Sequence, residues 1–214
     1  MNNIVLNDKL AVIYINDVIN EVICGTVTVN NANYHHNSNY KFASSIIKHG
    51  ILTIDDMQTK GIVNYSDDEL TIKRDNTSHI NGTDAVSLSV VGLTDLYRYE
   101  DEYFPFSNYE IDFLVDDEVK TDRVAINYGN EFLSYKSIPN NMIRSVDLRL
   151  LEYVNGKNCT IKDAVDKFNY LVTAAKTLKN SKLNIPLRET SYDKNNMLDI
   201  NKISSIPKLV LKKQ

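Results

Sequence analysis

The spacing of hydrophobic residues predicts a helix over residues 8–24, near the start of the chain. Asn7 lies where an N-cap is favoured, and Gly25 lies where a left-handed C-cap is favoured. The β-branched residues at 26–29 predict a short strand after this helix. The apolar positions follow the i, i+3, i+4, i+7, i+8 spacing of a helix with one buried face, and they are Ile15, Val18, Ile19, Val22 and Ile23.

A second strand and helix are predicted between residues 33 and 60. We expect a short strand over 33–36 and, after a polar break, a helix over 40–49 that ends at Gly50. Thr53 lies where it would cap a further short helix over 54–60. The polar residues 61–83 show no periodicity and predict a loop.

The centre of the chain predicts several strands. Residues 85–91 alternate between apolar and polar side chains, which is typical of a strand with one buried face. A tight turn is expected at 128–130. The other segments that favour extended structure are 111–115, 123–127, 131–135 and 142–151.

The C-terminal third contains the longest predicted helix, over 161–178, with Thr160 as its cap. The remaining residues, 183–214, are polar and lysine-rich, and we expect a docked arm or a partly disordered tail. The order helix, strand, helix, several strands, helix predicts an α+β fold. The length of 214 residues suits one domain with a real core, which we place at 1–182.

Composition and charge narrow the class of protein. The 24 basic and 28 acidic side chains give a net charge of −4, which excludes a basic coat over the whole chain but not a local basic groove. The two cysteines, Cys24 and Cys159, are too few for a disulfide framework. The N-terminus does not have the pattern of a signal peptide, and no apolar run approaches the roughly 20 residues that span a bilayer. We therefore expect a cytoplasmic protein without a membrane partner.

The sequence does not contain the familiar catalytic and metal-binding motifs. The chain has no phosphate-binding glycine loop, no dinucleotide fingerprint and no HExxH or GxSxG motif. Its four histidines do not follow a metal-ligand spacing, so we expect no metal. Paired carboxylates such as Asp55–Asp56 are interpreted as solvated or helix-capping charges.

Three segments nevertheless form an ordered pattern. The first is His-Asn-Ser at 36–38, which is followed by a predicted helix and by His-Gly-Ile-Leu at 49–52. The second is Val-Ser-Leu-Ser at 86–89, on a predicted strand. The third is Tyr-Gly-Asn-Glu-Phe-Leu at 128–133, followed by Ser-Ile-Pro at 137–139.

In this order the segments resemble the ADP-ribosyltransferase superfamily, and most of all the bacterial DNA-targeting ADP-ribosyltransferase toxins and their relatives. In that family a strand with H-x-[TS] precedes a helix end of the form I-L-x-x-G-[IL]-L, and a later strand opens with a catalytic Glu. The resemblance covers about residues 33–150 and implies a split mixed β-sheet core with flanking helices. It implies NAD as substrate, a macromolecular acceptor (DNA, RNA or protein), and a toxin, phage or anti-defence setting.

The resemblance also implies roles for individual residues. Glu131 would be the carboxylate that stabilises the oxocarbenium-like transition state when the nicotinamide–ribose bond breaks. His36 would bind the adenosine-side ribose, with Ser38 beside it, and Arg74 is a further catalytic candidate. The other implied contacts are Ser87, Ser89, Tyr97 and Tyr99 for NAD, and Tyr128 and Asn130 in an acceptor loop.

Two details qualify this assignment. His35 and His36 are adjacent, so they should lie on opposite faces of a strand, and the match favours His36. The Ser-Leu-Ser triplet at 87–89 stands where many family members carry a tyrosine or a Ser-Thr-Ser triplet.

Two other functions remain open. The chain could be a non-enzymatic binding protein or inhibitor, encoded by a phage or mobile element, because its acidic charge and 13 tyrosines suit an interaction surface. It could also be an RNA 2′-phosphotransferase of the same superfamily. That chemistry needs several cations around the first histidine to hold a phosphate, and only Lys41 and Lys48 lie near His36 in the sequence, so it ranks lowest.

Overall fold

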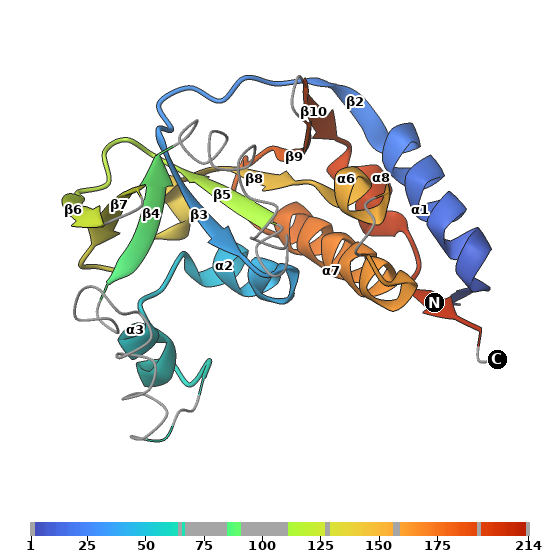
Figure 1. Ribbon diagram of the computed structural model, residues 1–214, viewed down its shortest axis with the longest axis horizontal. Coiled ribbons are helices and arrows are strands. Elements are labelled where there is room, and N and C mark those ends of the chain that lie inside the picture. Colours follow the sequence, from blue (N-terminus) through green and yellow to red (C-terminus); the bar gives the residue numbers. More distant parts are fainter. Residues whose placement is uncertain are drawn as a thin grey trace.

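A nine-stranded, mostly antiparallel sheet forms the centre of the molecule (Figure 1). The structure is a computed structural model, and it describes residues 3–63, 66, 85–90, 111–126, 129–155, 159–191 and 194–212. The strand order is β2-β10-β9-β8-β5-β3-β4-β7-β6. Their bounds are β2 (Ile23–Thr26), β3 (Tyr34–Ser38), β4 (Val86–Val90), β5 (Ile111–Val115), β6 (Asp122–Ile126), β7 (Gly129–Ser134), β8 (Ile143–Leu148), β9 (Leu187–Ser191) and β10 (Lys194–Leu198).

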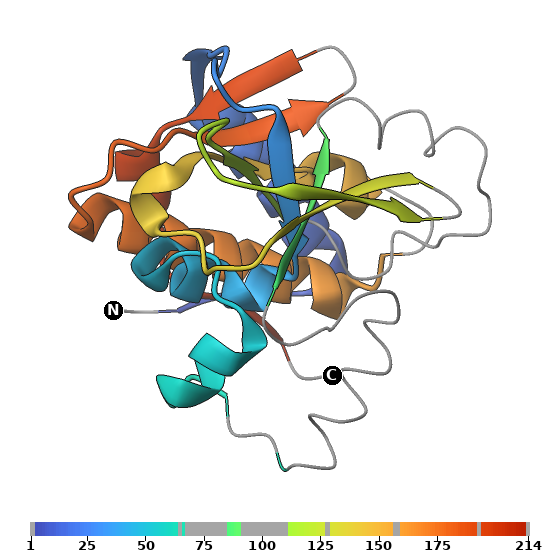
Figure 2. The same ribbon diagram turned by 90° about the vertical axis from the view of Figure 1, so that its left-hand side faces the viewer.

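Helices pack against this sheet and complete an α+β fold (Figures 1 and 2). A short parallel pair, β1 (Ile4–Leu6) with β11 (Leu209–Leu211), joins the two ends of the described chain. In the main sheet, β8 and β9 are parallel and the other pairs are antiparallel. The helices are α1 (Asp8–Val22), α2 (Ala43–His49), α3 (Ile54–Thr59), α6 (Leu150–Asn155), α7 (Ile161–Asn180) and α8 (Ile200–Ser205), with 3-10 turns η1 (Tyr40–Phe42) and η2 (Asn140–Met142).

The hydrophobic core is continuous between α7 and the middle of the sheet. Ile111, Phe113 and Val115 alternate along β5 and are fully buried, as expected for one face of a strand. Phe168 and Leu171 of α7 are also fully buried and belong to the same cluster. The apolar face of β5, which has period 2, and the apolar face of α7, which has period 3.6, therefore belong to one core.

The predicted helices are confirmed, and their caps explain their ends. In α1 the side chain of Asn7 accepts a hydrogen bond from the backbone N–H of Leu10. In α3 the hydroxyl of Thr53 accepts from the N–H of Asp56 at 3.1 Å, and Thr160 caps α7 in the same way. The helix predicted over 40–49 is η1 followed by α2. α1 ends two residues before the predicted boundary, with Ile23 as its C-cap, and Gly25, which was predicted to be that cap, lies within β2.

The strands predicted near 85–91, 111–115, 123–127 and 131–135 are confirmed as β4, β5, β6 and β7. The turn predicted over 128–130 is wrong in its extent, since β7 begins at Gly129. The strand predicted over 33–36 extends to Ser38 as β3. The strand predicted over 26–29 is wrong, since β2 ends at Thr26. The loop predicted over 61–83 lies mostly outside the described residues.

Two predictions at the C-terminal side differ from the structure. Extended structure was predicted over 142–151, but β8 ends at Leu148 and α6 begins at Leu150. The carboxylate of Glu189 accepts from the N–H groups of Leu150 and Leu151, and so caps α6. Residues 183–214, expected as a polar arm or tail, contribute β9, β10, α8 and β11.

None of the helices in the described parts of the chain combines the length and apolar character that crossing a membrane requires.

Candidate functional site

The three sequence segments of the ordered pattern meet in the middle of the sheet. His36 and Ser38 lie on β3, Ser87 and Ser89 on β4, and Glu131 on β7. These strands are consecutive neighbours in the order β3-β4-β7, although long stretches of chain separate them. The fold therefore brings the three segments together.

The hydrogen-bonded ladder between β3 and β4 is short and ends just before His36. It contains the pairs Tyr34–Val90 and His35–Ser89. On its other side, β3 pairs with β5 over its full length to Ser38. The sheet consequently parts between β3 and β4 at the H-x-S segment. The ring of His36 spans this opening, with Nδ1 at 3.0 Å from the carbonyl oxygen of Ser87.

The contact with Ser87 fixes the protonation of His36. A carbonyl oxygen only accepts, so Nδ1 carries the proton and Nε2 is the acceptor of a neutral ring. Burial lowers the pKa of His36 below its ordinary value of 6.5, and the positive charge of a protonated His35 adds to this effect. The hydrogen bond to Ser87 and the charge of Asp112 oppose it without reversing it. A neutral imidazole suits hydrogen bonding to a sugar hydroxyl.

The register of the strands gives a different grouping from the sequence match. Ser89 pairs with His35 on one side and with Glu131 on the other. Register partners in antiparallel strands share a face of the sheet, and adjacent residues alternate. Positions 35, 89 and 131 therefore share one face and position 36 lies on the other, whereas the sequence pattern groups Glu131 with His36.

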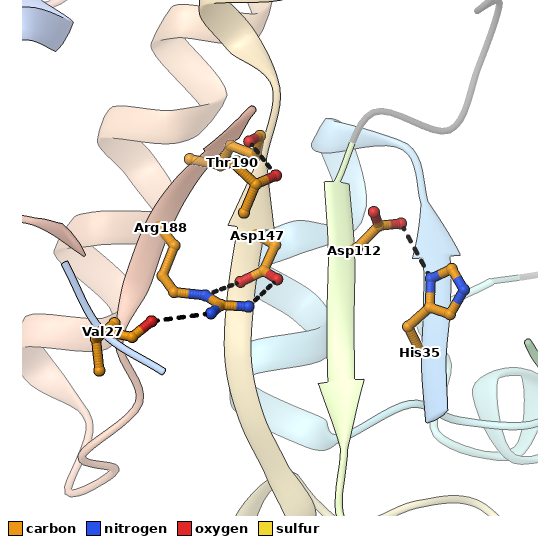
Figure 3. Close-up of polar contacts among 7 residues, drawn as sticks. Val27, His35, Asp112, Asp147, Arg188 and Thr190 are labelled. Atoms are coloured by element: carbon orange, nitrogen blue, oxygen red, sulfur yellow. Dashed lines mark hydrogen bonds and ion pairs between the residues drawn. The ribbon is translucent and has the colours of Figure 1, made fainter. Parts of the chain in front are cut away.

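A row of buried and half-buried ionisable side chains crosses the sheet on the face of His35 (Figure 3). Nδ1 of His35 lies 3.6 Å from Oδ1 of Asp112 on β5. Asp112 is paired in register with Asp147 on β8, and Asp147 forms an ion pair with Arg188 on β9. Arg188 also donates to the carbonyl of Val27 at 3.2 Å. Sequence reasoning missed this row. Its one visible signal is an aspartate between apolar residues in β5 and again in β8.

The remaining part of the pattern forms a backbone junction outside the strands of the main sheet. Ile51 and Ile138 exchange two hydrogen bonds, of 2.9 Å and 2.8 Å. The N–H of Thr53 donates to the hydroxyl of Ser137 at 2.9 Å. The His-Gly-Ile-Leu and Ser-Ile-Pro segments, which sequence analysis placed in one pattern, are therefore in direct contact.

The structure describes some of the other predicted site residues and not others. Ser38 is buried, Ser87 is exposed and Ser89 is half-buried. Asn130 was expected in an acceptor loop, but it lies within β7, as does Glu131. The candidates outside the described residues are Arg74, Tyr97, Tyr99 and Tyr128.

A hollow of about 260 Å³ lies elsewhere, where Lys48 at the end of α2 meets the C-terminal half of α7. It does not include any residue of the three strands that carry the pattern. Within the described residues, three or more His, Cys, Asp or Glu side chains do not come together as a metal site.

Comparison with family models found no match to this chain, and comparison with curated proteins found none either.

Proposed function

We propose that this protein is an NAD-dependent mono-ADP-ribosyltransferase that modifies a nucleic-acid base or a protein side chain. The observation that carries the proposal is the meeting of the pattern's segments. The H-x-S, Ser-Leu-Ser and Glu131 segments lie on adjacent strands, and residues 49–52 hydrogen-bond to residues 137–139. Segments that resembled the family by chance would not be expected to converge in one part of the fold.

The opening between β3 and β4 is a second feature that bears on the proposal, although the strand register places Glu131 on the face opposite His36. The resemblance implies a split mixed sheet, and the ladder between these strands ends beside His36. There Nε2 of the neutral His36 ring accepts a hydrogen bond, which fits the hydroxyl of a ribose. Ser38 follows His36 on the same face of β3, where it would stand beside that ribose.

The chemistry is a substitution at the anomeric carbon of the nicotinamide ribose. The bond between that carbon and the nicotinamide nitrogen breaks, and its electron pair leaves with nicotinamide. An acceptor nitrogen or oxygen forms the new bond and loses its proton. Glu131 would hydrogen-bond the ribose hydroxyl and stabilise the positive charge that develops in the transition state.

The test is transfer of label from NAD. Purified protein is incubated with labelled NAD and, separately, single-stranded DNA, duplex DNA, RNA and a cell lysate, and nicotinamide release and acceptor labelling are measured. We expect wild type to label one acceptor class. Glu131→Gln should lose at least about a hundredfold, the usual cost of removing a main electrostatic group. Glu118→Gln, a change of the same type at an exposed turn residue, is the matched control and should retain activity.

Variants of the two histidines test which of them binds NAD: His36, as the sequence match implies, or His35, which shares a face with Glu131. If the match identifies the NAD ligand, His36→Ala raises the KM for NAD far more than His35→Ala at equal fold stability. The reverse order would assign the ligand to His35. Wild-type protein that releases no nicotinamide with any of the four acceptor preparations would end the proposal.

A specific observation also supports the second candidate, a non-enzymatic binding protein. Phe42, Tyr135 and Tyr170 are each more than 40% exposed, which is typical of contact residues. Affinity capture from a host lysate tests this function. Retention of one stoichiometric partner by wild type and Glu131→Gln alike, without nicotinamide release, would favour it.

A further inference from the structure

Two segments of this chain contain lysines but no carboxylates. Residues 40–50 and 167–182 contain no Asp or Glu, although the whole chain has a net charge of −4. Their six lysines contribute +6, so the rest of the chain carries −10. We call these two segments the lysine surface, and its lysines are Lys41, Lys48, Lys167, Lys176, Lys179 and Lys182.

The fold places the two segments side by side, since η1 and α2 pack against α7 (Figure 1). At one end, Nζ of Lys167 lies 5.8 Å from the ring centroid of Tyr40. At the other end, Lys48 and Lys176 line the hollow of about 260 Å³. Lys167 and Lys176 are nine residues apart, which is roughly 14 Å along α7 at 1.5 Å per residue. The exposed Asp166 marks the limit of the surface on the N-terminal side of α7.

Exposed aromatic rings lie among these cations. Phe42 and Tyr170 are each 41% exposed, and Nζ of Lys41 lies 4.8 Å from the ring centroid of Phe42. Tyr170 follows Lys167 by one turn of α7, so both lie on the same side of the helix. Aromatic rings interspersed with lysines are the combination that binds single-stranded nucleic acid, since bases stack on the rings and phosphates pair with the cations.

The hollow adds groups suited to a phosphate backbone. Besides its two lysines it is lined by Thr173, Thr177, Asn180 and Ser181, which offer hydroxyl and amide donors. Lysines near the C-terminus of a helix also stabilise the helix dipole, and that role explains Lys48 and Lys179. It does not explain Lys167, which lies in the N-terminal half of α7, or the exposed ring of Tyr170 one turn further along.

We propose that the lysine surface binds a single-stranded nucleic acid, and that this strand is the acceptor of the transferase. The second clause rests on the proposed function. The surface begins at Tyr40, two residues after Ser38 of the H-x-S segment, so a strand lying along it would reach the opening between β3 and β4. Because the rest of the chain carries −10 and repels a polyanion, the lysine surface is where such a strand is held.

The test is a binding measurement without NAD, so it does not depend on transfer. Fluorescence anisotropy follows fluorescein-labelled oligo-dT and oligo-U of about 20 nucleotides, a duplex of the same length, and competition by phosphatidylserine vesicles. We expect both single strands to bind. Four phosphate contacts predict a log–log salt slope of about −2.8, or roughly 50-fold weaker binding at 200 mM than at 50 mM salt.

Two pairs of substitutions separate the contribution of the lysine charges from that of aromatic stacking. Lys48→Gln/Lys176→Gln should make the slope shallower by about 1.4, whereas the matched control Lys60→Gln/Lys120→Gln, on exposed lysines elsewhere, should leave it unchanged. Phe42→Ala/Tyr170→Ala should weaken binding at least about fivefold with the slope unchanged, because stacking is uncharged.

Each other outcome overturns the proposal. Wild type that does not bind either single strand at about 50 mM salt refutes it, as does equal weakening by the control pair. Duplex binding as tight as single-strand binding excludes stacking, and full displacement by the vesicles reassigns the surface to anionic lipid. Binding without transfer refutes the proposed function and the acceptor role of the strand, but not the binding surface. Transfer without binding refutes this inference alone.

Discussion

Gly50 lies against the backbone carbonyl of Ile138, so closely that a Cβ atom at position 50 would be 2.1 Å from that oxygen. The backbone of Gly50 also has φ +85°, a conformation that favours glycine. This contact sits beside the paired hydrogen bonds between Ile51 and Ile138. The glycine of the His-Gly-Ile-Leu segment is therefore required by its approach to the Ser-Ile-Pro segment.

We predict that Gly50→Ala destabilises the protein by about 3 kcal/mol or more, because it adds both a backbone clash and an unfavourable φ. The measurement is the free energy of unfolding from a urea titration. Gly61→Ala is the matched control, since Gly61 has φ +66° but open space around its Cβ position. It should lose only about 1–2 kcal/mol. Equal losses in the two variants would contradict the close approach.

The buried pair of Asp147 and Arg188 gives a second prediction. Arg188 Nε donates to Oδ1 of Asp147 at 2.7 Å, and both residues are less than 10% exposed. Arg188→Met should cost about 3–5 kcal/mol, because it leaves a buried carboxylate without its cation. Burial raises the pKa of Asp147 despite Arg188, which shows that desolvation of the carboxylate is costly.

The paired replacement Asp147→Leu/Arg188→Met should therefore cost much less than the sum of the two single changes. Urea titrations of wild type, both single variants and the double variant complete the thermodynamic cycle. Additive losses would show that the two side chains do not stabilise the sheet as a pair.

The sequence alone was enough to predict the elements that are determined by residues within their own segment. The helices α1 and α7 were predicted because an apolar stripe and a capping side chain lie within the segment itself. The start of α6 was not, because its capping carboxylate belongs to Glu189, far along the chain. Strand β9 was missed because its buried polar residues do not form an apolar alternation: Arg188 is satisfied by Asp147 and Thr190 by the carbonyl of Leu148.

The candidate site also has features that the sequence predicted and features that only the structure shows. The order of the pattern predicted which segments belong together, and β3, β4 and β7 are indeed neighbours. The sequence could not give the register, which pairs Ser89 with His35 rather than His36. A shift of one residue exchanges the faces of a strand, so the register must come from the structure.

Protonation of His36 provides a third prediction. Its folded pKa is lowered, so the unfolded chain binds a proton more readily below about pH 6.5. This contribution to stability is present above the unfolded pKa and is lost as the pH falls from about 6.5 toward the folded pKa. Unfolding free energies measured between about pH 7.5 and pH 5 should fall more steeply for wild type than for His36→Gln.

His49→Gln, a change of the same type at an exposed histidine, is the matched control. Long-range proton–nitrogen NMR gives an independent measurement. We expect the His36 ring to be neutral with its proton on Nδ1 at pH 7, because Nδ1 donates to Ser87. A neutral ring that carries its proton on Nε2 instead of Nδ1 would contradict this hydrogen bond.

Lys167 gives the last prediction, since burial lowers its pKa to about 8. Half of this amine is neutral near pH 8, where an ordinary lysine with a pKa of about 10.4 is almost fully protonated. Trace acetylation followed by mass spectrometry should therefore label Lys167 several-fold faster than the exposed Lys179, with a midpoint near pH 8. Stability should respond too, because the unfolded chain binds more protons between about pH 8 and pH 10.4. The wild type should gain stability relative to Lys167→Met across that range, whereas Lys179→Met should follow the wild type. Labelling of Lys167 with a midpoint above about pH 10 would show that the amine is not desolvated beside Tyr40.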